Sequence, residues 1–221
     1  MELLSELLGR LHPLVLHLPI GFLVLGILLF AKDRRQKEYR GLLATLFLWT
    51  GLAGALACLS GYLLYRSGGY SYESVGGHLW FGIATTLFCF LLYARQRSNL
   101  PPFLNRIPLP ALLALGLVLI SVTGHKGGTL THGEGYLTEP LPKAVKKALG
   151  LPVFEELPIA LTADNWKEAA LYAGVVHPIL NNKCVGCHGP TQAKGGLRLH
   201  REEDILSGGK NGRVIEANTP A

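Results

Sequence analysis

Five consecutive residues toward the C-terminal end of the chain have the types and spacing of a covalent haem attachment site, and they are called the haem motif below. Cys184 and Cys187 are separated by two residues, and His188 follows directly. Two thiols one helical turn apart can form thioether bonds to the two vinyl groups of haem, and the adjacent imidazole can then bind the iron. We therefore predict haem c attached through Cys184 and Cys187, with His188 as the proximal iron ligand.

A redox-active dithiol or half of a zinc site would use the same pair of cysteines. A redox pair is expected beside a β-α-β pattern, and a structural zinc site needs a second pair of ligands at a suitable spacing. Neither accompanies the motif, because the other two cysteines, Cys58 and Cys89, lie inside long apolar runs. We interpret those two as small packing residues, so the motif favours haem.

Most of the remaining chain is apolar. Only 16% of its 221 residues are charged, and the mean hydropathy is +0.30. Four stretches without Asp, Glu, Lys or Arg approach or exceed the roughly 18–20 residues that a membrane-spanning helix requires, at about 11–31, 41–65, 74–94 and 107–125. We therefore predict an all-α fold, in which a four-helix transmembrane bundle is followed by a small helical c-type cytochrome domain.

The basic residues predict which way these helices cross the membrane. The loop at 32–40 contains five of them, and Arg95, Arg97 and Arg106 lie in the loop after the third helix. The positive-inside rule places both basic loops in the cytoplasm, so both termini and the haem motif are expected outside. Haem is attached to c-type cytochromes on that side. The expected location is the cytoplasmic (inner) membrane, with membrane lipid as a partner.

Three further expectations concern the net charge and the N-terminal part of the chain. The net charge of +6 comes largely from the cytoplasmic loops, so it does not indicate a nucleic-acid partner. The first apolar run is too long for a cleavable signal peptide and is followed by a basic segment, which favours an uncleaved anchor. Leucines at helical spacing predict a short amphipathic helix over 1–10.

Five histidines occupy the membrane-spanning stretches or their outer ends: His12, His17, His78, His125 and His132. Ionisable residues in membrane helices are costly and favour a functional interpretation, and a helical bundle can build a cofactor site from facing side chains. We predict a second, non-covalent haem b or a metal in the bundle. The first-choice ligands are His17, His78 and His125, one from each helix, with His12 and His132 as second choices. The alternative is that the histidines hydrogen-bond neighbouring helices or interfacial water.

Proline, glycine and the haem motif indicate the organisation of the chain. The transmembrane domain is expected over 1–135, a proline-punctuated linker over 136–165 and the cytochrome domain over 166–221. We also predict a short helix near 142–149, with Pro142 in its first turn. A second helix, at about 170–180, is expected to lead into the haem motif.

Two further motifs follow the haem motif: the run Lys-Gly-Gly-Leu-Arg-Leu at 194–199 and a Gly-Gly pair at 208–209. On these three motifs, residues at about 174–221 resemble the planctomycete-type cytochrome c domain. The resemblance implies a small helical c-type cytochrome domain, with Cys184 and Cys187 as attachment points and His188 as proximal ligand.

The first part of the chain carries a second resemblance. His12-Pro13, the run from His17 to Gly21 and the closing segment from Gly124 to Gly133 are similar to a family of four-helix membrane domains of unassigned function, over about residues 1–140. No chemistry is assigned to that family. The resemblance therefore supports the architecture and says nothing about a cofactor.

The distal iron ligand is the point at which the chain departs from the cytochrome pattern. Met1 is its only methionine, so no methionine follows the haem motif. We therefore expect the 166–221 domain to be truncated and this chain to be the N-terminal part of a longer protein that supplies the ligand. The alternatives are ligation by His200 or His177, or five-coordinate iron. His200 lies in a charged stretch, where a histidine is more often a surface residue.

Together these features favour a membrane-anchored c-type cytochrome that relays electrons on the extracytoplasmic face of the cytoplasmic membrane. The alternative is a haem-containing subunit or sensor module of a larger enzyme, with the bundle as a passive anchor. No Ser-His-Asp order, phosphate-binding loop or paired-carboxylate motif supports catalysis, so an electron carrier is preferred. No sequence feature identifies the redox partner protein or a quinone pocket.

Overall fold

The computed structural model describes residues 2–35, 38–68, 70–133, 135–151, 153, 156–160, 170–190 and 193–216. Helices and loops make up these ranges, and no β-strand occurs in them, so the prediction of an all-α fold is confirmed. The chain forms two compact units. The first comprises Met1–Gly68 and Val75–Lys126, and the second comprises Gly69–Ser74 and Gly127–Ala221.

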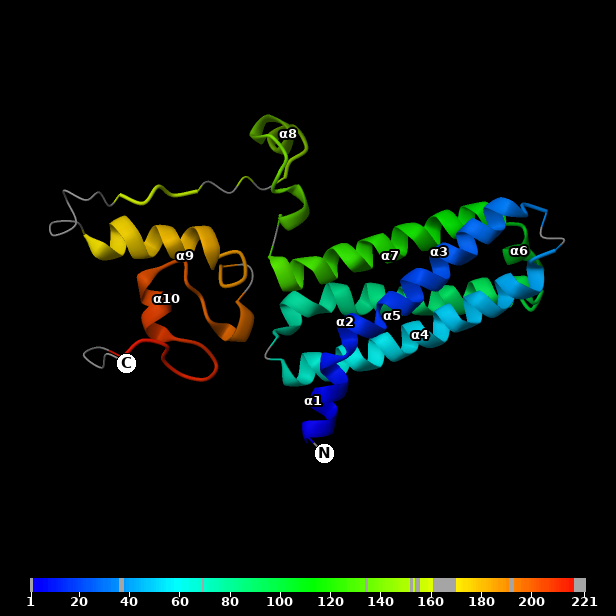
Figure 1. Ribbon diagram of the computed structural model, residues 1–221, viewed down its shortest axis with the longest axis horizontal. Coiled ribbons are helices and arrows are strands. Elements are labelled where there is room, and N and C mark those ends of the chain that lie inside the picture. Colours follow the sequence, from blue (N-terminus) through cyan, green and yellow to red (C-terminus); the bar gives the residue numbers. More distant parts are fainter. Residues whose placement is uncertain are drawn as a thin grey trace. The chain divides into compact units, whose positions relative to one another are not determined.

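Four helical stretches are long and apolar enough to cross a membrane. The first, Leu3–Lys32, is divided into α1 (Glu2–Arg10), α2 (His12–Val15) and α3 (His17–Lys32); the others are α4 (Arg40–Ser67), α5 (Tyr72–Gln96) and α7 (Leu109–His132). A short helix, α6 (Pro102–Asn105), lies between α5 and α7 in the sequence. The long helices run side by side in Figure 1. Each stretch overlaps one predicted span, so the four-helix prediction is confirmed.

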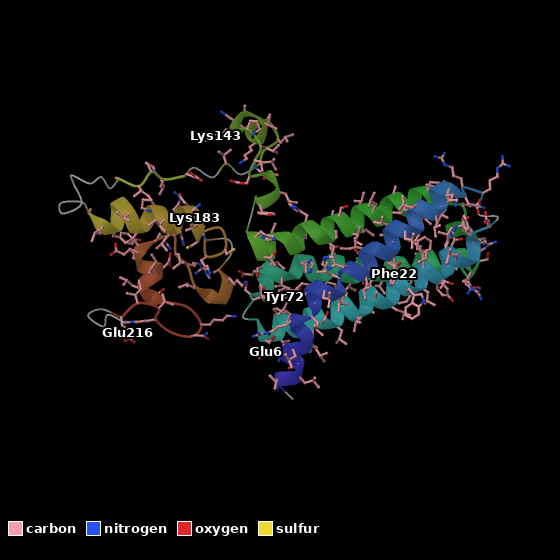
Figure 2. The ribbon with its side chains drawn as sticks, in the orientation of Figure 1. Glu6, Phe22, Tyr72, Lys143, Lys183 and Glu216 are labelled. Carbon is pink, nitrogen blue, oxygen red and sulfur yellow. The ribbon has the colours of Figure 1, made fainter. Side chains whose placement is uncertain are left out.

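The bundle is held together by a buried apolar core and by close approach of helices at glycine. The core comprises Leu23, Leu43, Phe47, Leu92, Leu109, Leu112 and Leu113. A Cβ added at Gly26 would lie 2.9 Å from the Phe47 ring, so this glycine lets α3 and α4 pack closely. Close packing of this kind is what associates helices in lipid, where no hydrophobic effect drives them together. Figure 2 shows that side chains on the outside of the long helices consist mainly of carbon, as a lipid-facing surface requires.

The first helical stretch is broken twice near its N-terminal end. The breaks fall at Leu11 and Leu16, and proline follows each of them within three residues. Proline has no N–H and is tolerated in the first turn of a helix, where that donor has no helical partner. The short helix expected at 1–10 is present as α1 and packs against α4. The break at Leu11 places His12 at the start of α2.

Helix α7 is about two turns longer than predicted. The predicted span ends at residue 125 with a glycine-rich segment beyond it, whereas the helix continues to His132. Glycine lowers helix propensity but does not by itself end a helix. The helix ends where Gly133 adopts a φ of +90°, a left-handed conformation that glycine adopts without a steric penalty. His125 and His132 are therefore helical residues of α7.

The second unit contains short helices joined by loops. They are η1 (Tyr136–Thr138), α8 (Lys143–Ala148), the π-helical η2 (Tyr172–Val176), α9 (His177–Lys183), the 3-10 turn η3 (Lys194–Gly196) and α10 (Glu202–Ser207). Helix α8 follows Pro142 as predicted, and η2 with α9 forms the helix expected before the haem motif. The predicted boundary between residues 165 and 166 lies outside the described residues, as does the end of the chain from 217 to 221.

Replacing Gly9 with alanine is expected to push α1 away from α4 and lower the stability of the bundle. A Cβ at Gly9 would lie 2.7 Å from the backbone nitrogen of Leu64, and backbone cannot move aside as a flexible side chain can. Overpacking of this kind costs about 1–3 kcal/mol. Thermal unfolding of the purified protein in detergent measures the effect.

The matched control for that substitution is Gly21→Ala in α3. An added Cβ there meets nothing within 4 Å in the part of the chain that the structure describes. Alanine at Gly21 is expected to stabilise the helix by about 0.5–1 kcal/mol through its higher helix propensity. Equal unfolding temperatures for the two variants would contradict the close packing of α1 on α4.

Candidate functional site

The haem motif begins where α9 ends. The backbone N–H of Cys184 donates to Leu180 O at 2.9 Å, which completes the last turn of α9. The following turn is closed by the N–H groups of Cys187 and His188, which donate to Cys184 O at 3.1 and 2.9 Å. Both thiols are free and half-buried. The turn therefore holds two thiols and one imidazole on a single short, hydrogen-bonded segment.

A backbone carbonyl orients the imidazole of His188. Its Nδ1 lies 3.2 Å from Leu197 O. Because a carbonyl oxygen only accepts hydrogen bonds, Nδ1 carries the proton and Nε2 keeps its lone pair. Metal-binding histidines commonly donate in this way from the nitrogen that does not bind the metal. The donor set therefore fits haem: His188 Nε2 would be the group that binds the iron, and the thiols of Cys184 and Cys187 would attach the ring system.

Two consecutive glycines present that carbonyl to the imidazole. Gly195 and Gly196 have φ values of +66° and +73°, in the left-handed region that residues with a Cβ rarely adopt. The N–H of Lys210 donates to Gly195 O at 2.9 Å. A Cβ at Gly209 would lie 2.9 Å from the same oxygen. The glycine turn and the Gly-Gly pair at 208–209 are therefore packed together.

Backbone hydrogen bonds also join the 194–199 run to the haem motif. The N–H of Lys194 donates to Cys187 O at 3.2 Å, and the N–H of Leu199 donates to His188 O at 2.7 Å. All three motifs that carry the cytochrome resemblance thus meet in one small region. The 194–199 run supports the proximal imidazole, a role that the sequence analysis did not assign to it.

Two glycines at the haem motif, Gly189 and Gly133, are in close contact with its backbone. A Cβ at Gly189 would lie 2.5 Å from Val185 O, and one at Gly133 would lie 3.1 Å from Gly186 O. Gly133 is also the residue whose positive φ ends α7. Within the second unit, the residue that ends α7 is therefore in direct contact with the haem motif.

The alternative distal ligands, His177 and His200, have other neighbours. The His177 ring packs against Tyr172, with centroids 6.0 Å apart. His200 Nε2 lies 3.4 Å from Asp204 Oδ2, whereas its Nδ1 is buried and has no hydrogen-bond partner in the described part of the chain. Tyr172, the neighbour of His177, has a raised phenol pKa, mainly because of desolvation and secondly because of the negative charge of Glu202. Of the two histidines, His200 keeps a buried nitrogen without a hydrogen-bond partner among these residues.

In the first unit, His12 of α2 and His78 of α5 form a pair. Their ring centroids are 6.1 Å apart, and the ring planes meet at 80°. Nδ1 of His12 lies 2.9 Å from Ala57 O, and Nδ1 of His78 lies 3.0 Å from Thr123 O. Both imidazoles therefore donate from Nδ1 to a helix carbonyl, as His188 does, and keep the lone pair on Nε2.

The separation of the two rings is that of an ordinary edge-to-face contact, and it is also compatible with both imidazoles binding one metal ion from opposite sides. Such centroids lie roughly 6 Å apart, because each metal–nitrogen bond is about 2 Å and the ring centre lies about 1 Å beyond the nitrogen. Gly61 makes room for this arrangement, since a Cβ there would lie 2.9 Å from the His12 ring. Within the described ranges, no group of three or more His, Cys, Asp or Glu could hold a metal ion. A pair of imidazoles suits haem, because the porphyrin supplies the remaining iron ligands.

Two of the three first-choice ligands lie outside this pair. His17 is exposed and begins α3, beyond the helix break at Leu16 that follows α2. His125 is also exposed. It comes two residues after Thr123, whose hydroxyl lies 3.0 Å from that of Thr85 in α5. Residues two positions apart in an α-helix are rotated from one another by about 160°. His125 therefore lies on nearly the opposite face of α7 from Thr123 and faces away from α5.

His132 also has a different neighbour. It is exposed, and its ring stacks on Tyr136 with centroids 4.3 Å apart. Of the five histidines predicted as ligands in the bundle, the structure thus brings two together. They are His78, a first-choice ligand, and His12, a second-choice ligand. His12 lies directly after a helix break and against Gly61, and the structure shows both features, whereas the sequence shows neither.

The fold and these sites describe a helical protein with four helices long and apolar enough to cross a membrane, followed by a hydrogen-bonded Cys-x-x-Cys-His turn whose donor set suits haem. Within the chain, residues 184–221 match the family model of Planctomycete cytochrome C. The match includes the haem motif, the 194–199 run and the Gly-Gly pair; it confirms the cytochrome resemblance over these residues and implies a haem cofactor. No match to a curated protein or to a solved structure was found. The resemblance of residues 1–140 to a four-helix family is not supported by a family match.

Proposed function

We propose that this chain is a membrane-anchored c-type cytochrome that relays electrons on the extracytoplasmic face of the cytoplasmic membrane. The observation that carries the proposal is the orientation of His188, whose Nδ1 is bound to Leu197 O inside the segment that matches the cytochrome family. The four membrane-capable helices support the anchor. The basic loops support the orientation through the positive-inside rule. Membrane lipid is the surrounding partner, and a redox protein or a quinone exchanges electrons with the site.

Each residue of the site has a defined task in this proposal. Cys184 and Cys187 tether the haem through thioether bonds and so keep it next to His188. The carbonyl of Leu197 holds the imidazole in one tautomer and one orientation, with Nε2 presented as the ligand. Haem supplies the one-electron redox chemistry when bound, and the protein sets its orientation and surroundings.

We further propose haem b as a second cofactor, held between His12 and His78 in the bundle. The ring separation of 6.1 Å and the two Nδ1–carbonyl hydrogen bonds support this assignment. If both imidazoles bound the iron, no coordination position would be open, which would favour electron transfer over the binding of a gaseous ligand. The bundle then takes part in the relay and is more than an anchor.

The test is a redox-titrated optical spectrum of the full purified protein, combined with its haem stoichiometry. We expect one c-type and one b-type haem per chain by pyridine haemochrome analysis, with a b-type spectrum that carbon monoxide does not change. A five-coordinate c-type haem that binds carbon monoxide would support the sensor or catalytic alternative. Absence of covalent haem from protein matured with the haem-attachment machinery would overturn the proposal.

A further inference from the structure

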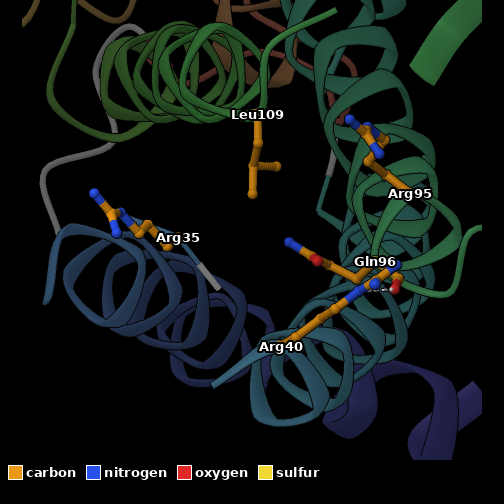
Figure 3. Close-up of a pocket in the computed structure, with 5 residues that line it drawn as sticks. All are labelled: Arg35, Arg40, Arg95, Gln96 and Leu109. Atoms are coloured by element: carbon orange, nitrogen blue, oxygen red, sulfur yellow. Dashed lines mark hydrogen bonds between the residues drawn. The ribbon is translucent and has the colours of Figure 1, made fainter. Parts of the chain in front are cut away.

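A polar cavity lies at the far end of the bundle from the His12–His78 pair, about 27 Å further along α5. It has a volume of about 270 Å³ and is lined by Arg35, Arg40, Arg95, Gln96 and Leu109. In Figure 3, Gln96 and Leu109 point into the space between the helices, and the three arginines lie around it. The lining residues come from the loop after α3, the start of α4, the end of α5 and the start of α7. We call this region the arginine end.

Two nitrogen donors at the arginine end have no acceptor among the residues that the structure describes. The Nε2 of Gln96 is buried and has no hydrogen-bond partner in the described ranges, and only 4% of the residue is exposed. The Nε of Arg95 is likewise buried and unpartnered among these residues. Leaving a buried donor unsatisfied is costly, and the cost is larger for a charged group. The two adjacent residues therefore indicate an acceptor beyond those that the described residues supply.

The positive charge of this region is also not balanced within the described residues. Arg95 donates from Nη2 to Asn105 O at 3.0 Å, and Arg40 donates from Nε to Gln96 O at 3.1 Å, so these contacts are with neutral acceptors. The ion pairs among the described residues involve none of the three lining arginines. Asp33, two residues before Arg35, uses Oδ2 to accept the backbone N–H groups of Glu38 and Tyr39. A ligand for this site should therefore carry negative charge.

The length of the helices places the cavity in the headgroup layer. Helix α4 has 28 residues; at about 1.5 Å per residue it is about 42 Å long, compared with about 30 Å for the hydrocarbon core of a bilayer. Its first residue, Arg40, therefore extends beyond the hydrocarbon into the layer that contains the lipid phosphates. Leu109 gives the cavity an apolar wall on the side of α7.

We propose that the arginine end binds the phosphate of an anionic phospholipid headgroup. A phosphate diester offers several acceptor oxygens, and guanidinium groups bind such oxygens in a planar, forked geometry. Basic pockets between membrane helices are suited to anionic headgroups for this reason. The donors of Arg95 and Gln96 recognise the phosphate, Arg35 and Arg40 add charge, and the acyl chains lie along the lipid-facing helices.

The first test measures stabilisation of the full haem-loaded protein in detergent by added phosphatidylglycerol, phosphatidylcholine or inorganic phosphate. We expect phosphatidylglycerol to raise the unfolding temperature, with little effect of the other two. Arg95→Gln and Arg35→Gln should weaken the apparent affinity for phosphatidylglycerol at least about tenfold, since each removes a charge that faces the phosphate. The control is Arg34→Gln, which removes the same charge from an exposed neighbour that does not line the cavity.

Each contrary outcome of this test overturns a stated part of the proposal. Equal stabilisation by phosphatidylglycerol and phosphatidylcholine would exclude recognition of anionic headgroups. Equal losses for Arg34→Gln and Arg35→Gln would mean that net charge, and not the cavity, attracts the lipid. Stabilisation by inorganic phosphate that disappears in Arg95→Gln would show a site for the free anion and exclude the lipid as its source.

A second variant separates lipid binding from folding. Gln96→Leu keeps the size of this buried side chain and removes its unpartnered donor, so without anionic lipid the protein is expected to be as stable as the parent or more stable. With phosphatidylglycerol, the variant should gain less stability than the parent does. If Gln96→Leu loses the same amount of stability with phosphatidylglycerol as without anionic lipid, a role of Gln96 in binding is contradicted.

Discussion

Replacing Cys184 and Cys187 together with alanine is expected to remove all covalently bound haem from the protein. A thioether bond needs a cysteine sulfur, and both sulfur atoms of the haem motif are free and half-buried in the turn after α9. Haem held by His188 alone dissociates when the protein is denatured. The measurement is a haem-dependent peroxidase stain after denaturing electrophoresis, which should fall from about one haem per chain to none.

The two cysteines of the bundle provide matched controls. Cys89 is 2% exposed, and Cys58 Sγ lies 3.5 Å from Thr86 Oγ1, so both are packing residues within the first unit. Cys58→Ala and Cys89→Ala should each retain the full covalent haem signal. Haem that survives denaturation in the Cys184→Ala, Cys187→Ala double variant would show that the motif is not the attachment site.

The membrane helices could be predicted from the sequence because hydropathy sums over many residues. A span of about 20 apolar residues gives the same signal whichever way each side chain points. The end of α7 lies about two turns beyond the predicted span for the opposite reason. Its glycine-rich segment is consistent with either a loop or a weak helix, and the outcome depends on one residue, Gly133, whose positive φ the sequence does not reveal.

The haem motif could be predicted because its chemistry is local, with all three side chains within five residues. Its support is not local in this way. His188 donates its hydrogen bond to the backbone carbonyl of Leu197. Every residue has such a carbonyl, so the type of residue at position 197 does not reveal this contact. Only the adjacent glycines, Gly195 and Gly196, give an indirect signal, because their left-handed conformations are the means by which the carbonyl is presented.

The pairing of histidines in the bundle depends on how each helix is rotated about its own axis. Sequence spacing shows that His12 and His17 lie on different faces of the first helical stretch, but it does not show which face meets α5. Contacts made by neighbouring residues decide this point. Gly61 of α4 lies against the His12 ring and leaves space for it, and the pair with His78 follows from that packing.

Replacing His12 or His78 with leucine is expected to abolish the b-type haem signal and leave the c-type signal unchanged. An axial ligand on each side of the iron is needed for a six-coordinate site, so either single substitution removes most of the bound haem b. The lost hydrogen bond, to Ala57 O or Thr123 O, contributes only about 0.5–1.5 kcal/mol, so both variants should still fold. The measurement is the ratio of b-type to c-type haem in the reduced pyridine haemochrome spectrum, which should fall at least about tenfold.

His17→Leu and His125→Leu are the controls for that experiment, because both residues are exposed and lie outside the pair. They should retain the b-type signal of the parent. If the His12–His78 pair only joins helices through hydrogen bonds, the His12→Leu and His78→Leu variants will show a lower unfolding temperature with no change in the haem ratio. The ratio therefore distinguishes a cofactor site from helix packing: a cofactor site loses haem while the bundle persists, whereas a packing contact loses stability while the haem content persists.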